Sequence, residues 1–205
     1  MSGVLIFGAG GHAKVVADIL CCQGVSIRGF LDDDPQSWGT TRLGIPVLGG
    51  IDAWIDHAPD GLVIGIGSNS IRRAIVARLG DRVQNLWRSA IHPRATIAES
   101  VRLGHGVVVA AHAVLNPDSV IGDHAIINTS ATVDHDCTIG AYVHIAPGVH
   151  LGGGVRVDEG TLIGIGSSVI PYRTIGSWAV IGAGAAVVTD IPDKVTAKGV
   201  PARWS

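Results

Sequence analysis

One histidine in the second half of the chain lies between two acids, in the order Asp134, His135, Asp136. A neighbouring carboxylate can orient an imidazole and raise its basicity, and an imidazole that titrates near neutrality can accept a proton from a nucleophile. The chain has nine histidines, and a histidine taken at random is more often structural than catalytic. The acidic neighbours nevertheless single out His135, and we predict that it acts as a general base.

A second chemical signal is the glycine loop near the N-terminus. The run from Gly8 to Ala13 fits the pattern G-x-G-x-x-A. Such a loop lets backbone N–H groups approach a pyrophosphate, and Asp32 has the spacing to accept a hydroxyl of a ribose or sugar. A dinucleotide site and a bare structural turn both remain open on the motif alone. Fewer than 90 residues precede the half of the chain that contains the repeats described below, about half of a full dinucleotide-binding fold.

Short apolar runs and helical patterns alternate around this loop, which is typical of a small parallel sheet with helices. We therefore predict a small α/β domain with a parallel sheet over residues 1–88. The expected strands are 4–7, 27–31, 45–48 and 62–66, and the expected helices are 12–22, 51–57 and 70–79.

From residue 97 to residue 187, every sixth residue is aliphatic without interruption. A period of six fits neither an α-helix nor simple strand alternation, but it fits a parallel β-helix with three flat faces and about 18 residues per coil. We expect the aliphatic residue to point inward, the small residue four positions later to fit beside it, and a glycine directly after it to turn the corner. The aliphatic series is Ile97, Leu103, Val109, Leu115, Ile121, Ile127, Val133, Ile139, Ile145, Leu151, Val157, Ile163, Val169, Ile175, Ile181 and Val187.

Composition excludes several other classes. With 15 basic and 17 acidic residues, no charge excess favours nucleic acid or an anionic membrane. No apolar run is long enough to cross a bilayer, and the N-terminus has no secretory pattern. The three cysteines have poor spacing for disulfides, so we expect a reducing cytoplasm and interpret Cys21 and Cys22 as packing residues.

We expect no metal site. The histidines, acid and cysteine near His135 lie at different hexad positions, so their side chains should not converge on one ion. The residues considered are Asp134, His135, Cys137, His144 and His150.

The repeat resembles the hexapeptide-repeat acyltransferases, whose left-handed β-helices assemble as trimers. With the front half added, nearly the whole chain resembles the NeuD/PglD-type family of sugar acetyltransferases. The segments that carry this resemblance are residues 8–16 (GAGGHAKVV), 30–33 (FLDD), 64–69 (IGIGSN), 127–130 (INTS), 133–137 (VDHDC) and 199–203 (GVPAR). The implied fold is an N-terminal Rossmann-like domain followed by a left-handed parallel β-helix over residues 89–205.

The resemblance implies a role for particular residues. His135 would be the general base with Asp136 as its partner, although many relatives have Glu at the second position. The N–H of Gly153, one coil above His135, would stabilise an oxyanion. The residues implied for the acceptor are Gly10, Gly11, His12, Asp32, Asp33, Gly67, Asn69 and Asn128, with Arg72 as a weaker phosphate or uracil contact. Those implied for acetyl-CoA are His144, Gly153, Gly164, Ile165 and Ala183.

Two of these residues have equally simple alternatives. Asn tolerates a left-handed turn, so Asn128 could be an ordinary corner residue. Arg72 could be a solvated charge on a helix.

The resemblance implies an acetyl-CoA-dependent N-acetyltransferase that acts as a homotrimer on a UDP- or GDP-linked 4-amino-4,6-dideoxysugar. The glycine loop would then hold the nucleotide-sugar and not NAD, and the product would enter surface polysaccharide biosynthesis. Two alternatives remain: O-acetylation of a sugar such as sialic acid, and a non-catalytic trimer that only binds nucleotide-sugars.

Overall fold

The structure is a computed structural model that describes residues 3–204. The chain forms two compact units, one up to Pro93 and one from Arg94 onward. No helix among the described residues is long and apolar enough to cross a membrane.

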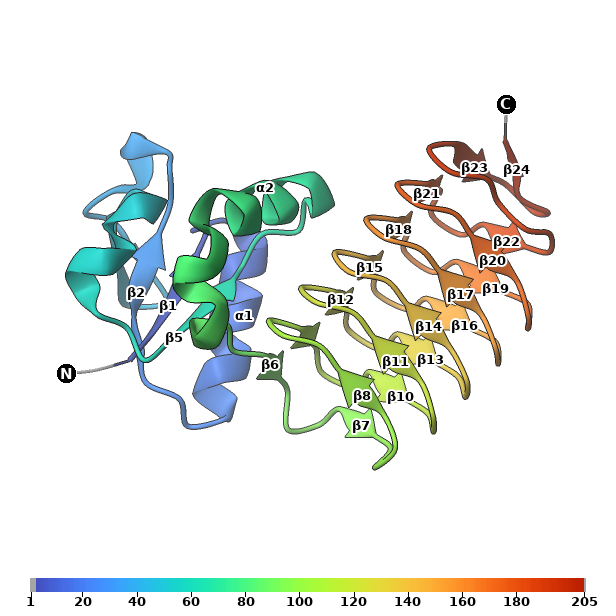
Figure 1. The fold of residues 1–205 in the computed structure, drawn as a ribbon, viewed down its shortest axis with the longest axis horizontal. Helices are drawn as coiled ribbons and strands as arrows, with labels where there is room; N and C mark the ends of the chain where they lie inside the picture. Colours follow the sequence, from blue (N-terminus) through green and yellow to red (C-terminus); the bar gives the residue numbers. More distant parts are fainter. Residues whose placement is uncertain (1–2, 205) are drawn as a thin grey trace. The chain divides into compact units, whose positions relative to one another are not determined.

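The N-terminal unit contains a five-stranded sheet in the order β3-β4-β2-β1-β5 (Figure 1). Strand β3 is antiparallel to β4, and the other pairs are parallel. The strands are β1 (Val4–Phe7), β2 (Ile27–Leu31), β3 (Thr41–Arg42), β4 (Ile45–Gly49) and β5 (Gly61–Ile64), and β6 (Ala90–Ile91) follows near the end of the unit. The α-helices are α1 (Gly11–Cys22) and α2 (Asn69–Leu79), and the 3₁₀ helices are η1 (Pro35–Ser37), η2 (Ile51–His57) and η3 (Gly80–Leu86).

The predicted strands and helices of this unit are confirmed, with boundaries that differ by a few residues. All four residues of β1 and of the edge strand β5 are buried, as expected for parallel strands that are covered on both faces. The segment 51–57 is a 3₁₀ helix, and β5 ends at Ile64, before the loop that leads into α2. The carboxyl ends of β1, β2 and β5 therefore place the glycine loop, Asp32 and Gly67 along one edge of the sheet.

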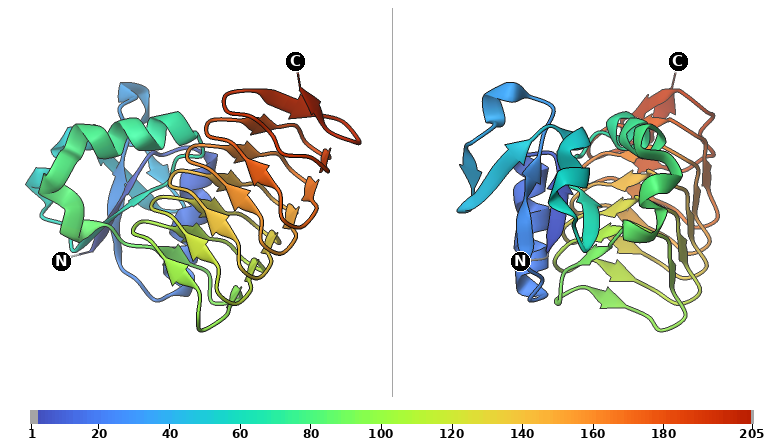
Figure 2. Two further views of the ribbon diagram at one scale, coloured as in Figure 1. Left: turned by 45° about the vertical axis from the view of Figure 1, so that its right-hand side comes forward. Right: turned by 60° about the vertical axis from the view of Figure 1, so that its left-hand side comes forward.

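The C-terminal unit is a left-handed parallel β-helix made of two-residue strands on three faces (Figures 1 and 2). The first face carries β7 (Thr96–Ile97), β10 (Val114–Leu115), β13 (Thr132–Val133), β16 (His150–Leu151), β19 (Ser168–Val169) and β22 (Ala186–Val187). The second carries β8 (Arg102–Leu103), β11 (Val120–Ile121), β14 (Thr138–Ile139), β17 (Arg156–Val157) and β20 (Thr174–Ile175). The third carries β9 (Val108–Val109), β12 (Ile126–Ile127), β15 (His144–Ile145), β18 (Leu162–Ile163), β21 (Val180–Ile181), β23 (Thr196–Lys198) and β24 (Arg203–Trp204).

The predicted period is confirmed in the register of these strands. Between β7 and β22, paired residues are 18 positions apart, as Val133 and Leu151 are. The aliphatic residue of each hexad is the second residue of its strand, and this series is buried from Val109 to Val187. Small residues such as Ala131 and Cys137 fill the interior beside it. The aliphatic core of the prism thus follows directly from the repeat.

The role predicted for the corner glycines is wrong in one respect. The glycine after each inward residue, such as Gly122, does not have a positive φ; the left-handed residue comes two positions later, as at His124 (φ 55°). A Cβ on Gly122 would lie 2.6 Å from the backbone nitrogen of Ala141 in the next coil. Glycine is required there because successive coils approach closely, and not because the chain turns.

The interpretation of Cys21 and Cys22 as packing residues is also wrong. Both are exposed on α1, whereas Cys137 is buried inside the prism. The buried face of α1 is formed instead by Ala13, Val16, Ala17, Ile19 and Leu20.

Candidate active site

His135 lies on the corner that follows strand β13, with its side chain about half exposed. Its Nδ1 is 2.7 Å from Oδ2 of Asp136. This hydrogen bond raises the pKa of His135, and the nearby charges of Asp134 and Asp136 add to the effect. When Nδ1 carries the proton that is shared with Asp136, Nε2 has a free lone pair and can accept a proton from a nucleophile.

The backbone around His135 is held by residues one coil earlier. Oδ1 of Asp134 accepts hydrogen bonds from the backbone N–H of His135 and from Nδ2 of Asn116, both at 2.8 Å. The hydroxyl of Ser119 donates to the carbonyl of Asp134. Sequence reasoning missed Asn116 and Ser119, although their spacing from Asp134 and Cys137 follows the 18-residue register.

Asp136 has a left-handed backbone conformation, with φ of 59°. Asp is one of the few residues other than glycine that tolerates this conformation. Its amide donates to the carbonyl of Pro117 in the preceding coil, at 3.1 Å. The same corner thus sets the direction of the Asp136 carboxylate and of the His135 ring that it contacts.

Gly153 lies against the ring of His135. A Cβ on Gly153 would be 2.6 Å from His135 Nε2, and the amide of Gly154 donates to the His135 carbonyl at 2.9 Å. The 18-residue register therefore brings Gly153 next to the predicted base, on the next coil. A backbone at this distance from Nε2 can contact the same reacting group as the imidazole.

Asn128 and His144 form a second polar pair in this unit. Nδ2 of Asn128 is 3.1 Å from Nε2 of His144, and Oδ1 of Asn128 accepts from the amide of Thr129. The left-handed corner residue is Ser130 and not Asn128, so turn formation does not explain the asparagine. His144 and His150 occupy the same position in successive hexads and lie on different faces of the prism.

The remaining residues implied for acetyl-CoA lie on later coils. A Cβ on Gly164 would be 2.7 Å from the backbone nitrogen of Ala183, so these two residues stack closely. The side chain of Ile165 is 61% exposed, which makes it available to an apolar ligand surface.

The N-terminal unit contains a pocket of about 390 Å³ at the edge of its sheet. Six of the seven residues predicted for the acceptor in this unit line it, and Asn69 instead begins α2 beside it. The lining consists of Gly8, Gly10, Gly11, His12, Asp32, Asp33, Ile51, Gly65, Ile66, Gly67, Ile71 and Ile75.

The acids of this pocket hold its loops. Asp32 accepts hydrogen bonds from the amide of Ala9 at 2.6 Å and from that of Asp34 at 2.9 Å. Asp33 accepts from the Ile51 amide and pairs with Arg78. Burial alone raises the pKa of Asp33, but the hydrogen bonds from Arg78 and Ile51 outweigh it and hold this pKa below its usual value.

His12 and Arg72 lie at the same end of the unit. Burial, followed by the charge of Arg72, lowers the pKa of His12 to about 4, so its imidazole is neutral near pH 7. The suggestion that Arg72 is a solvated charge is wrong, because it is only 1% exposed. Its guanidinium donates to the carbonyls of Ile66 and Gly67 and so braces the loop before α2.

Comparison with known proteins identifies both halves of the chain. Residues 3–79 match the PglD N-terminal domain, and residues 118–153 match the bacterial transferase hexapeptide repeat. Perosamine N-acetyltransferase from Caulobacter crescentus, solved with CoA and GDP-perosamine, is 44% identical with a TM-score of 0.91. The similarity covers 100% of this chain and 97% of that one. The chain belongs to the NeuD/PglD-type family of sugar acetyltransferases.

Other members support this assignment. The acetyltransferase domain of PglB from Neisseria gonorrhoeae is 38% identical over 98% of both chains, with a TM-score of 0.89, and it has also been solved with acetyl coenzyme A. The Bacillus subtilis UDP-N-acetylbacillosamine N-acetyltransferase is 39% identical over 54% of this chain. The chain matches about half or less of the length of its curated relatives, 52% in that case. The relatives named here are acetyltransferases, and two of them have been solved with CoA or acetyl coenzyme A.

Proposed function

We propose that this protein transfers the acetyl group of acetyl-CoA to the amino group of a nucleotide-linked aminosugar. The observation that carries the proposal is the His135–Asp136 pair beside Gly153, in a chain that is 44% identical over its full length to perosamine N-acetyltransferase. Because that relative binds GDP-perosamine, our preferred acceptor is a GDP-linked 4-amino-4,6-dideoxysugar. The UDP-linked sugar named for the Bacillus relative is the second acceptor to test.

In the proposed reaction, the amine attacks the thioester carbonyl carbon while Nε2 of His135 accepts a proton from the amine. The resulting oxyanion receives a hydrogen bond from the Gly153 amide. The carbon–sulfur bond then breaks, and the imidazolium returns its proton to the departing CoA thiolate. The Asp136 carboxylate stabilises the charged ring between these two steps.

A covalent acetyl-enzyme is not part of this scheme. Cys137 is buried, and burial raises the pKa of its thiol. A protonated thiol inside the prism is a poor nucleophile. Direct transfer therefore suits this site better than a two-step mechanism.

We assign the N-terminal pocket to the nucleotide end of the acceptor. The amides at the start of α1 and the close backbone of Gly10 and Gly11 suit a diphosphate. A neutral His12 can both donate and accept a hydrogen bond there without repelling Arg72.

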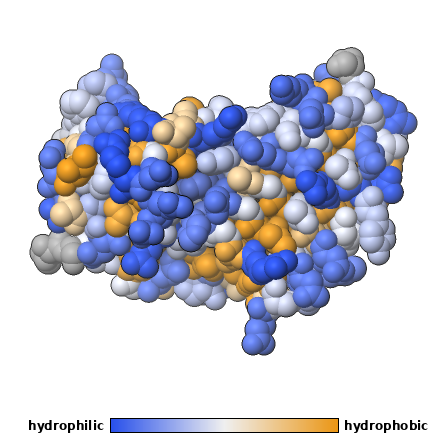
Figure 3. Space-filling model, viewed as in Figure 1, coloured by the Kyte–Doolittle hydropathy of each residue, from blue (hydrophilic) through white to orange (hydrophobic). Residues whose placement is uncertain are grey.

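The assembly that we propose is a homotrimer, with acetyl-CoA bound in the groove between adjacent β-helices. Apolar surface lies among hydrophilic residues in the space-filling view (Figure 3). The exposed aliphatic side chains of the β-helix include Ile165, Ile170 and Val180. Three free cysteines suit a reducing compartment, so we place the reaction in the cytoplasm, as a step that supplies surface polysaccharide biosynthesis.

The proposal is tested by CoA thiol release with a panel of GDP- and UDP-linked aminosugars, and with mass detection of the acetylated product. We expect the His135→Ala variant to lose about 10²–10⁴-fold in kcat. Its substrate affinities should change little, because the imidazole acts mainly in the transition state. His150→Ala is the matched control, since this exposed histidine lies on β16 and contacts Thr132.

The same assay separates the alternatives. If the protein acetylates sialic acid but no aminosugar, its activity is O-acetylation and not the proposed N-acetylation. Tight nucleotide-sugar binding without thiol release from any acceptor would indicate a binding protein. A folded His135→Ala variant with near-normal turnover would remove His135 from the mechanism.

A further inference from the structure

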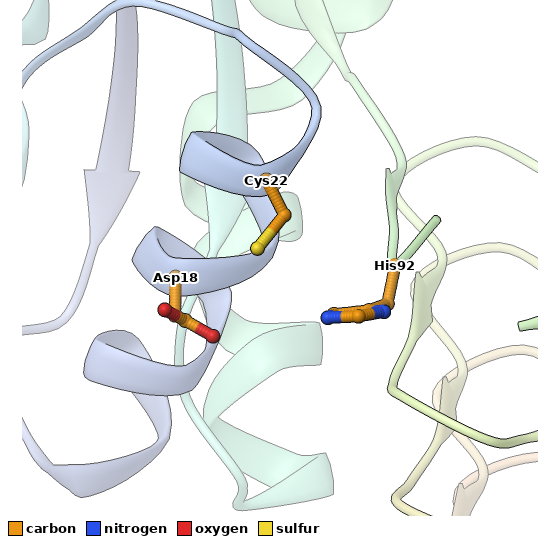
Figure 4. A group of neighbouring side chains, drawn as sticks. All are labelled: Asp18, Cys22 and His92. Atoms are coloured by element: carbon orange, nitrogen blue, oxygen red, sulfur yellow. The ribbon is translucent and has the colours of Figure 1, made fainter. Parts of the chain in front are cut away.

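Three potential metal ligands meet on the surface of the N-terminal unit (Figure 4). Asp18 and Cys22 lie one turn apart on the same face of α1, and His92 comes from the segment directly after β6, a strand that packs against α1. One carboxylate oxygen, the Cys22 sulfur and one imidazole nitrogen all lie within 4.8 Å of one another. Among the described residues, this is the one group of three such side chains that meets this distance.

We infer that Asp18, Cys22 and His92 bind a zinc ion. Sulfur, imidazole nitrogen and carboxylate oxygen are the donors that Zn²⁺ takes, at about 2.0–2.3 Å. Tetrahedral bonds of that length place the donor atoms roughly 3.3–3.8 Å apart. The three donor atoms already lie within 4.8 Å of one another, so they need to approach by about 1.0–1.5 Å at most. The thiolate disfavours Mg²⁺ and Ca²⁺, which prefer oxygen ligands.

The backbone already arranges these three ligands. Residues four apart on a helix project from the same face, a spacing that also places two zinc ligands in helical metal motifs. All three side chains are at least partly exposed, so an ion can reach them and a water molecule can complete the tetrahedron. A carboxylate and a thiolate also balance the two charges of the ion.

An ordinary ion pair between Asp18 and His92 would involve only two of these groups. In that case Cys22 would contribute nothing to metal affinity, and this difference is what the experiment measures. The expectation of no metal came from residues near His135, and the sequence pattern did not indicate this cluster because His92 is far from Cys22 along the chain.

The bound ion would link α1 to the segment after β6 and so stabilise the N-terminal unit. The other end of α1 carries Gly11 and His12, which line the pocket. The inference does not rest on the proposed acetyl transfer, which uses no metal in our scheme.

The test uses the full-length protein after treatment with a chelator. Zinc is titrated in competition with a chromophoric chelator, Co²⁺ is added separately to look for thiolate-to-metal charge-transfer absorption, and Tm is followed in both series. We expect one tight zinc per chain, the thiolate band with Co²⁺, and a Tm that rises with zinc concentration because the ion binds the folded state.

Cys22→Ser should lower the zinc affinity by at least the roughly 10–100-fold that loss of an outer-shell partner alone costs, and should abolish the cobalt band. Asp18→Asn should weaken zinc binding as well. The matched control is Cys21→Ser, which removes the adjacent exposed thiol from a different face of α1.

Zinc binding that is unchanged in Cys22→Ser, or equally weakened in Cys21→Ser, would overturn the inference, as would a chain that takes up no zinc. Thiol-release activity measured on the metal-free protein reports on the proposed function separately.

Discussion

At the scale of single residues, one hydrogen bond sets the chemistry of the candidate base. His135 is half exposed, and its contact with Asp136 is the largest cause of its raised pKa, outweighing the opposite effect of burial. The left-handed backbone of Asp136 brings its carboxylate to 2.7 Å from Nδ1 of the ring.

This contact predicts the pH dependence of catalysis. The base is active when it is deprotonated. We therefore expect kcat/KM to be low at pH values below the raised pKa of His135 and to rise to a plateau above it. Asp136→Asn removes the largest cause of the raised pKa, so its acid limb should move to lower pH. Its plateau rate should also fall, because a weaker base accepts the proton less well.

Initial rates from pH 5 to 9 would measure both effects. Asp158→Asn serves as the control, since Asp158 pairs with Arg156 on a neighbouring coil. If the acid limb of Asp136→Asn coincides with that of the parent protein, the Asp136 carboxylate does not tune the group that titrates in the rate profile.

His12 makes a separate prediction about stability. Its pKa falls from 6.5 to about 4 on folding, so between these values the unfolded chain binds a proton that the folded chain does not. The free energy of unfolding should therefore have its full value above pH 6.5 and should decrease as the pH falls toward 4. At about 1.4 kcal/mol per pKa unit, the loss approaches roughly 3 kcal/mol.

Urea unfolding of the N-terminal unit at pH 7 and pH 5 would measure this change. His12→Gln should flatten the dependence, since glutamine does not titrate, whereas the control His57→Gln, on η2, should retain it. If the free energy of unfolding depends on pH equally in the parent protein and in His12→Gln, groups other than His12 cause the dependence.

At the scale of the elements, the hexad explains why so many glycines are present and why they are not equivalent. Those that follow an inward residue face the backbone of the next coil, as Gly122 faces Ala141. Gly153 instead faces the side chain of His135. The same substitution should therefore have different consequences at the two positions.

We predict that Gly153→Ala mainly lowers activity and that Gly122→Ala mainly lowers stability. The methyl group at 153 would lie 2.6 Å from Nε2 of His135, and the exposed ring can swing away at little cost to the fold. At 122 the methyl meets backbone 2.6 Å away, which cannot move freely, and overpacking of this kind costs about 1–3 kcal/mol.

Thermal unfolding and thiol release on the two variants would test this pair of expectations. A Gly153→Ala protein with full activity would show that the imidazole and the glycine backbone do not share a reacting group. A Gly122→Ala protein as stable as the parent would show that adjacent coils can separate at this corner.

At the scale of the whole molecule, the two units supply different parts of the proposed reaction. The parallel sheet gathers a pocket at the carboxyl ends of its strands, as open α/β sheets do. The β-helix presents His135 on a rigid stack in which every strand is held by those on neighbouring coils. A rigid support of this kind suits a base that must be positioned accurately.

We predict a trimer of about 63 kDa from the 21.1 kDa chain. Exposed aliphatic side chains such as Ile165 and Ile170 along the coils would be covered by neighbouring copies. Light scattering at assay concentrations, with and without CoA, measures the mass directly. A monomer that is fully active would remove the shared CoA groove from the mechanism.

The sequence alone determined the β-helix and the strands of the N-terminal sheet. A hexad repeat determines which of its residues are buried, because each inward residue stacks on residues 18 positions away. This stacking does not depend on how the rest of the chain folds. The same 18-residue spacing predicts that Gly153 lies next to His135, one coil later. Buried runs such as residues 4–7 likewise have few alternatives to a central strand.

Only the tertiary structure decided the contacts between irregularly spaced segments. Burial of Arg72 under the loop at Gly67, and the meeting of Cys22 with His92, depend on how loops and helices pack after the sheet has formed. No local period encodes such contacts, so the sequence left Arg72 open between a ligand contact and a solvated charge, and it assigned Cys22 to packing. The solvated Arg72 and the packed Cys22 are wrong for the same reason: a helical pattern shows which residues share a face, but it does not show what the rest of the chain places against that face.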